Sequence, residues 1–320
     1  MVTGATGLIG ANVCELLRTQ GHEVVALVRE GSDAAALTAL GVEIVRGDIT
    51  VTADVDRASD GVDVIVNSAA LLGGPGQSLD DQLAANHLAA LSCYDAGSRG
   101  GRRVIELSTT PFLRRDRTLT ERPELLDEAE IGDDPYAISK GRAFRDGMDR
   151  VRAGEDIVFV IPGGTFGPSP VVKRAMAITS FNRLVRAAIL GHVTEFPAFP
   201  VPWVLARDVA LAVVAAIDRG EPGVAYIAFG REEMTTAAFL DLACRVAGVA
   251  HRVADVVLDP TDESFRAQYG ETMFDMATRV WPTPTYDNSE TLRVLGLEPV
   301  PIEAGLVQTV AWLRNEGWLG

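Results

Sequence analysis

The sequence has few of the features that define several large classes of protein. No apolar run approaches the roughly 20 residues that a membrane-spanning helix requires. The chain opens without the basic segment of a secretory signal peptide. The net charge is −15 at pH 7 and no basic stripe is visible, which argues against nucleic-acid binding. We therefore expect a cytoplasmic protein that binds neither a membrane nor a nucleic acid.

Residues that could form disulfides or hold a metal are also scarce. The chain has 3 cysteines and 4 histidines, and neither set shows metal-ligand spacing. A scattered, odd number of cysteines suits a reducing compartment. Lysine is scarcer still, because Lys140 and Lys173 are the only lysines among 29 basic residues. Where arginine supplies nearly all the positive charge, a lysine is expected to have a specific role.

The sequence does contain short apolar strands that alternate with amphipathic helices. Apolar runs lie at 24–28, 42–45, 62–66, 104–107 and 157–161, with helical patterns such as 79–98 and 136–151 between them. Buried strands that alternate with helices predict a parallel sheet covered on both faces. We predict an α/β fold with a doubly wound parallel sheet (Rossmann fold) and a smaller C-terminal substrate-binding lobe.

The expected boundary between these parts follows residue 162. Residues 1–162 form the predicted dinucleotide-binding core and 163–320 form mainly the lobe, with a segment at about 203–230 returning to the core. Residues 163–202 are rich in Gly, Pro and Phe and are expected to form loops around one helix near 176–189. The remaining elements are expected at 207–219, 225–229, 236–247 and 302–315.

Three glycines stand where the first strand should meet the first helix. Gly4, Gly7 and Gly10 have the spacing G-x-x-G-x-x-G. A pyrophosphate must approach backbone N–H groups at a helix N-terminus, and glycine permits that approach. The triplet opens a βαβ pattern, which favours dinucleotide binding over a turn that uses glycine for packing alone. The expected cofactor-binding residues of this turn are Gly4, Thr6, Gly7, Leu8 and Ile9.

The end of the second strand bears on the choice of cofactor. An acidic residue there holds the ribose 2′-hydroxyl of NAD, whereas an arginine accommodates the 2′-phosphate of NADP. The strand ends at Arg29, and Glu30 beside it is a competing acid. Arg29 therefore favours NADP, with NAD as the alternative.

A tyrosine and a lysine share one face of the helix predicted after Pro135. Tyr136 and Lys140 stand at positions i and i+4, so the phenol and the ammonium can converge. A phenol with a pKa of about 10 is a poor acid–base catalyst near neutrality, and a nearby ammonium favours its ionised form. Hydroxyls at 108–110 end the preceding strand, where one of them could polarise a carbonyl. The alternatives are a solvated helix face and a set of turn-forming hydroxyls.

These features together resemble the extended short-chain dehydrogenase/reductase family, also called the NAD-dependent epimerase/dehydratase family. The glycine turn resembles its TGATGxIG motif, residues 47–49 its G-D-[ILV], and 67–70 its H-x-A-A with asparagine in place of histidine. Asn86 matches the asparagine of the next helix, and PGGTFGP at 162–168 resembles the loop over the nicotinamide. Ser108-Thr109 lies over the paired serines of the family, so Thr109 replaces the catalytic serine.

The resemblance implies roles for particular residues. The implied catalytic residues are Thr109, Tyr136 and Lys140, and Lys140 also holds the ribose. The further cofactor-binding residues that it implies are Asp48, Ile49, Ala69, Ala70, Pro162 and Thr165. Only Met1 and Val2 precede the turn, so the first strand is expected to be short.

Within the family, the residues after the second strand look most like the dihydroflavonol and cinnamoyl-CoA reductase branch. This implies an NADP(H)-dependent oxidoreductase that interconverts a carbonyl and a secondary alcohol on a small molecule, in a protein that could form a homodimer. The alternatives are an NAD-dependent sugar-nucleotide epimerase and a member that binds the cofactor without catalysis. Aromatic residues favour a hydrophobic substrate, although each of them taken alone is better explained as a core residue; they are Phe112, Phe166, Phe181, Phe196, Phe199 and Trp203.

Overall fold

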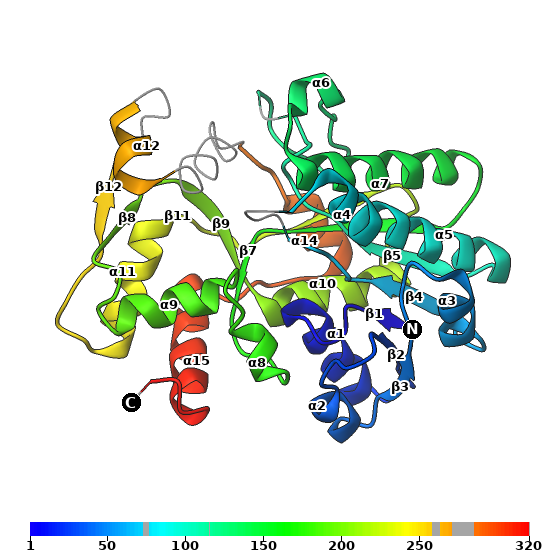
Figure 1. Cartoon of the computed structure of the whole chain (residues 1–320), viewed down its shortest axis with the longest axis horizontal. Coiled ribbons are helices and arrows are strands. Elements are labelled where there is room, and N and C mark those ends of the chain that lie inside the picture. Colours follow the sequence, from blue (N-terminus) through cyan, green and yellow to red (C-terminus); the bar gives the residue numbers. More distant parts are fainter. Residues whose placement is uncertain (73–76, 115, 258–262, 271–284, 320) are drawn as a thin grey trace.

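The computed structural model describes residues 1–72, 77–114, 116–257, 263–270 and 285–319. Its larger part is a seven-stranded parallel sheet enclosed by helices, and a smaller lobe stands beside it (Figure 1). The strands of the large sheet are β1 (Val2–Thr3), β2 (Val25–Val28), β3 (Glu43–Arg46), β4 (Val64–Asn67), β5 (Arg103–Leu107), β6 (Ile157–Pro162) and β10 (Ala225–Ala228). This is the doubly wound α/β sheet that the alternating pattern predicts.

The order of the strands defines where a ligand can bind. It is β10-β6-β5-β4-β1-β2-β3. The strands β2 and β3 are added on one side of β1, and β4 and the later strands are added on its other side, so the strand order reverses between β1 and β4. In open α/β sheets the ligand lies outside the carboxyl ends of the strands, at such a reversal. The glycine turn follows β1, so the Rossmann arrangement places it at this point.

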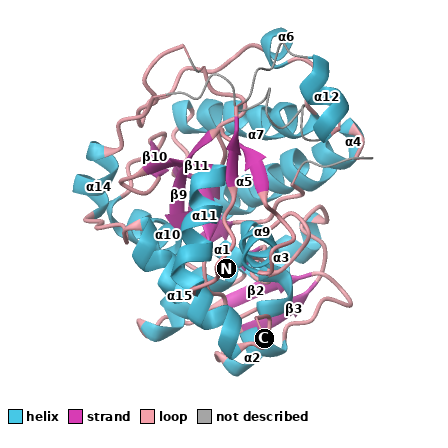
Figure 2. Cartoon of the chain, turned by 90° about the vertical axis from the view of Figure 1, so that its left-hand side faces the viewer, coloured by secondary structure: helices cyan, strands magenta, loops and turns pink. Residues whose placement is uncertain are grey.

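Helices cover both faces of the sheet (Figure 2). Those of the larger part are α1 (Leu8–Thr19), α2 (Ala35–Ala39), α3 (Thr52–Ser59), α4 (Leu79–Gln82), the π-helix η1 (Leu83–Leu88), α5 (Ala89–Gly100), α6 (Glu128–Ile131), α7 (Pro135–Arg152) and α10 (Ala206–Arg219). The helices α1 and α10 pack together over one apolar core, and α3, α5 and α7 cover a second. Alternate residues of the strands feed the two cores, as buried parallel strands require.

The lobe contains two small sheets and a third apolar core. Its strands are β7 (Gly164–Phe166), β8 (Glu195–Pro197), β9 (Pro200–Leu205), β11 (Glu233–Thr235) and β12 (Ala254–Val256). Its helices are α8 (Val172–Ala175), α9 (Phe181–Ile189), α11 (Thr236–Ala247), α12 (Glu263–Tyr269) and α15 (Ile302–Asn315), whereas α14 (Ser289–Leu295) packs against α10 and β10 of the larger part. None of the helices in the described ranges is both long and apolar enough to cross a bilayer.

The prediction for residues 163–202 was wrong in two respects. We expected loops around one helix near 176–189, but a second helix (α8) and the strands β7, β8 and part of β9 also lie in this segment. The helix α9 begins only at Phe181, because the Ser180 hydroxyl accepts the Asn182 N–H and caps it. The strands escaped prediction because they are short and β9 contains Pro200 and Pro202, which lack the N–H typical of a central strand.

The aromatic residues that suggested a hydrophobic substrate belong instead to the apolar cores. Five of the six are at most 8% exposed, namely Phe112, Phe166, Phe196, Phe199 and Trp203. The indole of Trp203 stacks on Phe239 with ring centroids 3.7 Å apart, and Phe181 meets it edge-on. Packing therefore accounts for these rings, and they no longer support an apolar substrate.

Candidate active site

The glycine turn packs against the segment that follows β4. Gly4 has a φ of 61°, and a Cβ on it would lie 2.5 Å from backbone atoms of Ser68. A Cβ on Gly10 would lie 2.4 Å from the Gly4 carbonyl oxygen and 2.6 Å from the Ser68 hydroxyl. Packing thus accounts for Gly4 and Gly10, and it also brings the turn beside Ala69 and Ala70.

The turn delivers the chain to a helix N-terminus that can bind an anion. Gly7 is the N-cap of α1 and supplies no side-chain acceptor. The N–H groups of the first helical turn have no acceptor within their own helix. Thr6, Leu8 and Ile9 are partly exposed, so a ligand can reach this end. The arrangement suits a phosphate group.

Two arginines lie at the loop that follows β2, Arg29 within the loop and Arg46 at the end of the neighbouring strand β3. Arg29 and Glu30 are both exposed there. Arg46, at the end of β3, donates from one guanidinium nitrogen to the carbonyl oxygens of Arg29 at 3.1 Å and Ser32 at 2.8 Å. The sequence analysis missed Arg46, which fixes the loop and adds positive charge beside Arg29. The signal that could have identified Arg46 was its position at the end of β3, the parallel strand beside β2.

Asp48 and Ile49 occupy the loop after β3. The Asp48 carboxylate accepts from the backbone N–H of Thr50 at 2.8 Å and from its hydroxyl at 2.7 Å. Ile49 packs against the core under α3 and α5. Asp48 is exposed at the same sheet edge as the glycine turn, where an adenine would extend.

Asn86 connects the segment after β4 to the start of α7. Its amide oxygen accepts from the Leu71 N–H at 2.8 Å, and its amide nitrogen has three acceptors within reach, Gln82 Oε1 at 2.6 Å and the Leu71 carbonyl and the Ser139 hydroxyl, each at 3.1 Å. Asn86 lies in the π-helix η1, a form of helix that is frequent at functional sites. It therefore links Ala70 and its neighbours to the helix that carries Tyr136.

Local sequence fixes the start of α7. Pro135 occupies the first turn, and the Asp134 carboxylate accepts from the N–H groups of Tyr136 at 3.0 Å and Ala137 at 3.3 Å. This cap defines where the helix begins, and with it the direction of the Tyr136 side chain. Tyr136 is partly exposed, so a substrate can meet its phenol.

The side chain of Lys140 reaches the end of β5. Its Nζ donates to the Leu107 carbonyl oxygen at 2.7 Å and to Glu106 Oε1 at 3.0 Å. Thr109 follows Leu107 by two residues and is partly exposed, whereas Ser108 is only 6% exposed. The structure thus brings Lys140 close to the chain that carries Thr109, and of these two hydroxyls it favours Thr109 for contact with a ligand.

Glu106 is a site residue that the sequence analysis missed. Its carboxylate lies within the buried strand β5 and is paired with Lys140. A charged residue in an otherwise apolar strand was the signal that could have identified it. Burial raises the pKa of Glu106, while the Lys140 ammonium and hydrogen bonds from Lys140 and Asn67 act in the opposite direction.

Pro162 and Thr165 lie where β6 passes into β7. Pro162 is the last residue of β6, and the Thr165 hydroxyl donates to the Gly163 carbonyl oxygen at 3.0 Å. A Cβ on Gly163 would lie 2.0 Å from the Pro202 carbonyl oxygen, so glycine is required there. Both Pro162 and Thr165 are partly exposed at the carboxyl end of the sheet.

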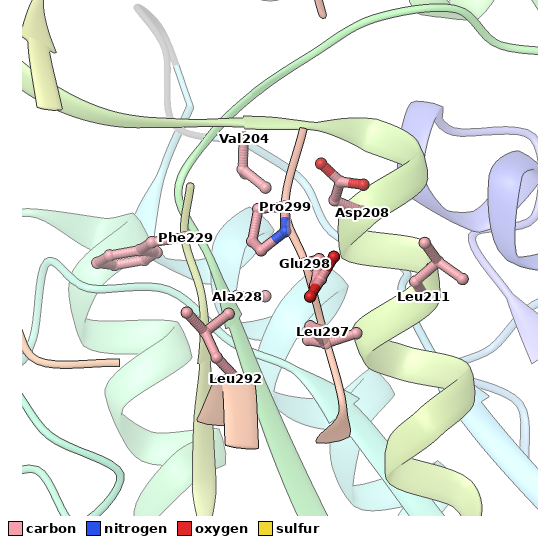
Figure 3. A pocket seen from close by; sticks show the side chains of 9 residues that line it. All are labelled: Val204, Asp208, Leu211, Ala228, Phe229, Leu292, Leu297, Glu298 and Pro299. Carbon is pink, nitrogen blue, oxygen red and sulfur yellow. The ribbon is translucent and has the colours of Figure 1, made fainter. Parts of the chain in front are cut away.

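A small pocket nearby is separate from these residues. It is lined by Val204, Asp208, Leu211, Ala228, Phe229, Leu292, Leu297, Glu298 and Pro299 (Figure 3). Asp208 Oδ2 accepts the Val300 N–H at 2.8 Å, and burial raises the pKa of this carboxyl. None of the candidate catalytic residues lines this pocket. The bond from Val300 to Asp208 instead anchors the segment before α15 to α10.

Replacing Asp208 with alanine is expected to lower the free energy of unfolding by about 1–3 kcal/mol, because the Val300 N–H loses its acceptor. Urea denaturation of the two proteins measures this change. Asp218→Ala is the control, since Asp218 is exposed on the same helix. Equal midpoints for Asp208→Ala and Asp218→Ala would contradict the anchoring role.

Comparison with known proteins identifies the family. Residues 1–228 match the model of the NAD dependent epimerase/dehydratase family. The chain therefore belongs to this family, and the resemblance drawn from its motifs is confirmed.

Individual relatives cover almost the whole chain. Sterol demethylase protein B of Methylococcus capsulatus is 27% identical over 345 residues, which cover 100% of this chain and 99% of that protein. Ceramide reductase of Caulobacter vibrioides is 24% identical over 335 residues, with 99% and 95% covered. The solved dTDP-glucose 4,6-dehydratase of Bacillus anthracis, in complex with NAD, superposes with a TM-score of 0.76 at 17% identity, covering 99% of this chain and 97% of that chain. The structural match confirms the fold.

Proposed function

We propose that this protein is an NADP(H)-dependent oxidoreductase that interconverts a carbonyl and a secondary alcohol on a small molecule. The observation that carries the proposal is the attachment of Lys140 to the end of β5. It brings the lysine to the chain that bears Thr109, while Tyr136 lies one turn earlier on the same helix. We therefore expect the Tyr136 phenol, the Thr109 hydroxyl and the Lys140 ammonium to lie near one another at the carboxyl edge of the sheet.

The residues present fit a dinucleotide. The first turn of α1 offers backbone N–H groups at the strand reversal between β1 and β4. We assign the pyrophosphate to Gly7 and its neighbours, and the ribose of the nicotinamide half to Lys140. When bound, the nicotinamide supplies or accepts the hydride.

Each protein group has one chemical task in this scheme. In the direction of reduction, the Tyr136 hydroxyl gives its proton to the carbonyl oxygen, and the Thr109 hydroxyl donates a hydrogen bond to that oxygen as negative charge develops. The Lys140 ammonium stabilises negative charge on Tyr136 after the transfer. The reverse sequence of proton movements oxidises the alcohol.

Arg29 and Arg46 support NADP over NAD. Their positive charges flank the loop after β2, where the 2′-phosphate of NADP would lie. Arg29→Asp is expected to lower the ratio of kcat/KM for NADPH to that for NADH by about 10-fold or more, since it removes the cation and adds a like charge to the phosphate. Steady-state kinetics with both cofactors measure the ratio.

The control for this experiment is Arg99→Ala, which removes an exposed arginine on α5. The ratio should stay at the wild-type value in this variant. If Arg29→Asp leaves the ratio unchanged as well, the choice of cofactor rests on other residues.

For the substrate we propose a hydrophobic carbonyl compound or alcohol. Two relatives support this choice, since their names refer to a sterol and to a ceramide. A screen of NADPH oxidation against steroid-like, long-chain and small aliphatic ketones tests the proposal, and activity on the small aliphatic compounds alone would refute it.

The alternative is an NAD-dependent sugar-nucleotide epimerase, which Glu30 favours as an acid near the ribose. Such an enzyme regenerates its cofactor in each cycle and keeps it bound. The cofactor content of the purified protein separates the two functions, because our proposal requires free exchange.

We further propose a homodimer located in the cytoplasm. All three cysteines are free and buried, which suits a reducing compartment. Light scattering on the purified protein measures the oligomeric state.

A further inference from the structure

A chain of buried polar side chains runs beneath the candidate active site. The Thr3 hydroxyl donates to Asn67 Oδ1 at 2.6 Å, and Asn67 Nδ2 donates to Glu106 Oε2 at 2.6 Å. Glu106 Oε1 accepts from Lys140 Nζ at 3.0 Å. The four residues are 1–2% exposed and come from β1, β4, β5 and α7. This network of hydrogen bonds therefore passes under the point between β1 and β4 where the strand order reverses. It lies behind the sheet edge at which we expect the cofactor to bind.

The donors in this chain define the charge of Glu106. An amide nitrogen and an ammonium can only donate, so both carboxylate oxygens act as acceptors. This pattern suits an ion pair of a carboxylate and an ammonium, in which Lys140 and the bond from Asn67 oppose the rise in the pKa of Glu106 that burial causes. The pair is buried, and neither charge has bulk water to stabilise it.

Two other titratable groups interact with Glu106, and both have raised pKa values. Cys93 and Tyr94 of α5 interact with Glu106, and burial raises the pKa of both above its ordinary value. The partly exposed phenol of Tyr136 stands one turn from Lys140 on α7. Of the described groups that interact with this pair, Glu106 is therefore the anion that balances the positive charge of Lys140.

We propose that Glu106 is a positioning residue, which keeps Lys140 protonated and directs its remaining N–H toward the ribose of the bound cofactor and the Tyr136 phenol beside it. Two of the three N–H donors of the ammonium are held by Glu106 and the Leu107 carbonyl, and this fixes the direction of the third. The inference rests on the proposed function, since it deepens the role assigned there to Lys140. Removal of the carboxylate leaves a buried ammonium without a partner, which releases its proton more readily.

The scarcity of lysine allows a direct test. Lysine labelled with ¹³C at Cε gives signals from two side chains, Lys140 and the exposed Lys173. Spectra of Lys140→Met assign the signals. In Glu106→Gln we expect the midpoint of the Lys140 titration to fall by about one pH unit or more, while the Lys173 midpoint stays in place.

Asn67→Ala is the matched control, because it removes a hydrogen bond from the same carboxylate but keeps its charge. The Lys140 midpoint should move much less in this variant. An unchanged midpoint in Glu106→Gln, or an equal shift in Asn67→Ala, overturns the proposal. If Glu106→Gln does not fold, Glu106→Asp replaces it, since a carboxylate further from Nζ predicts a smaller shift in the same direction, and no shift overturns the proposal.

A kinetic measurement provides the second readout. As Lys140 loses its proton, kcat for reduction should fall, so the basic limb of the pH profile should move to lower pH in Glu106→Gln. A purely structural role for Glu106 would lower stability and leave the limb in place. The NMR titration does not depend on turnover, so it remains valid if the proposed reaction is wrong.

Discussion

Replacement of Tyr136 with phenylalanine is expected to lower kcat by about 10²- to 10⁴-fold, the range that a positioned acid–base group contributes. The substitution removes the proton donor and keeps the ring. The cap at Asp134 involves only the backbone of Tyr136, so the start of α7 should persist. Binding of the cofactor, measured by fluorescence titration with NADPH, should therefore stay close to the wild-type value.

Tyr226→Phe is the matched control for this loss. It also removes one phenol hydroxyl, which accepts the Glu221 N–H at 3.0 Å, but it lies on the edge strand β10. We expect a small loss of stability and a normal kcat. Near-normal turnover in Tyr136→Phe would refute the assignment of Tyr136 as the proton donor.

Replacement of Lys140 with methionine is expected to lower the free energy of unfolding by about 3–5 kcal/mol, because it leaves the carboxylate of Glu106 buried without its partner. A second substitution, Glu106→Gln, should restore most of this loss, since an amide needs no counter-ion. Urea denaturation of the two single variants and the double variant measures both effects. Equal stability of Lys140→Met and the double variant would show that the ion pair does not determine the loss.

The loss in Lys140→Met should depend on pH. Burial raises the pKa of Glu106 above its ordinary value of 4.5, and the lysine opposes this. Without the lysine, the folded protein holds a proton on Glu106 more tightly than the unfolded chain does. The loss of stability in Lys140→Met is therefore smallest below pH 4.5, and it grows as the pH rises through the pKa of Glu106 in the folded variant. Denaturation curves at several pH values check this direction.

The sequence was sufficient to predict the features that depend on local pattern. Runs such as 24–28 and 157–161 read as buried strands because parallel sheets bury both faces of a strand. Tyr136 and Lys140 could be paired because the helical repeat brings positions i and i+4 together. The glycine turn could be placed because it joins a strand to a helix.

Contacts between distant segments could not be predicted in this way. Glu106 meets Lys140 across 34 positions of the sequence, and Arg46 meets Arg29 across 17. No periodicity marks such pairs, since they depend on which strands become neighbours. The short strands of the lobe pose the same difficulty, because β7 is defined by its pairing with β9, in which Gly164 lies opposite Trp203.

Asn86 has a mechanical consequence for the whole site. The side-chain amide of Asn86 forms hydrogen bonds with the N–H and the carbonyl of Leu71 and with the Ser139 hydroxyl. The loop on the cofactor side and the first turns of α7 therefore behave as one stiff unit, in which a displacement of either part is transmitted to the other. A substitution that displaces the segment after β4 is therefore expected to displace Tyr136 as well, whereas Arg29 and Arg46, to which we assign the choice of cofactor, lie after β2 and β3 outside this unit.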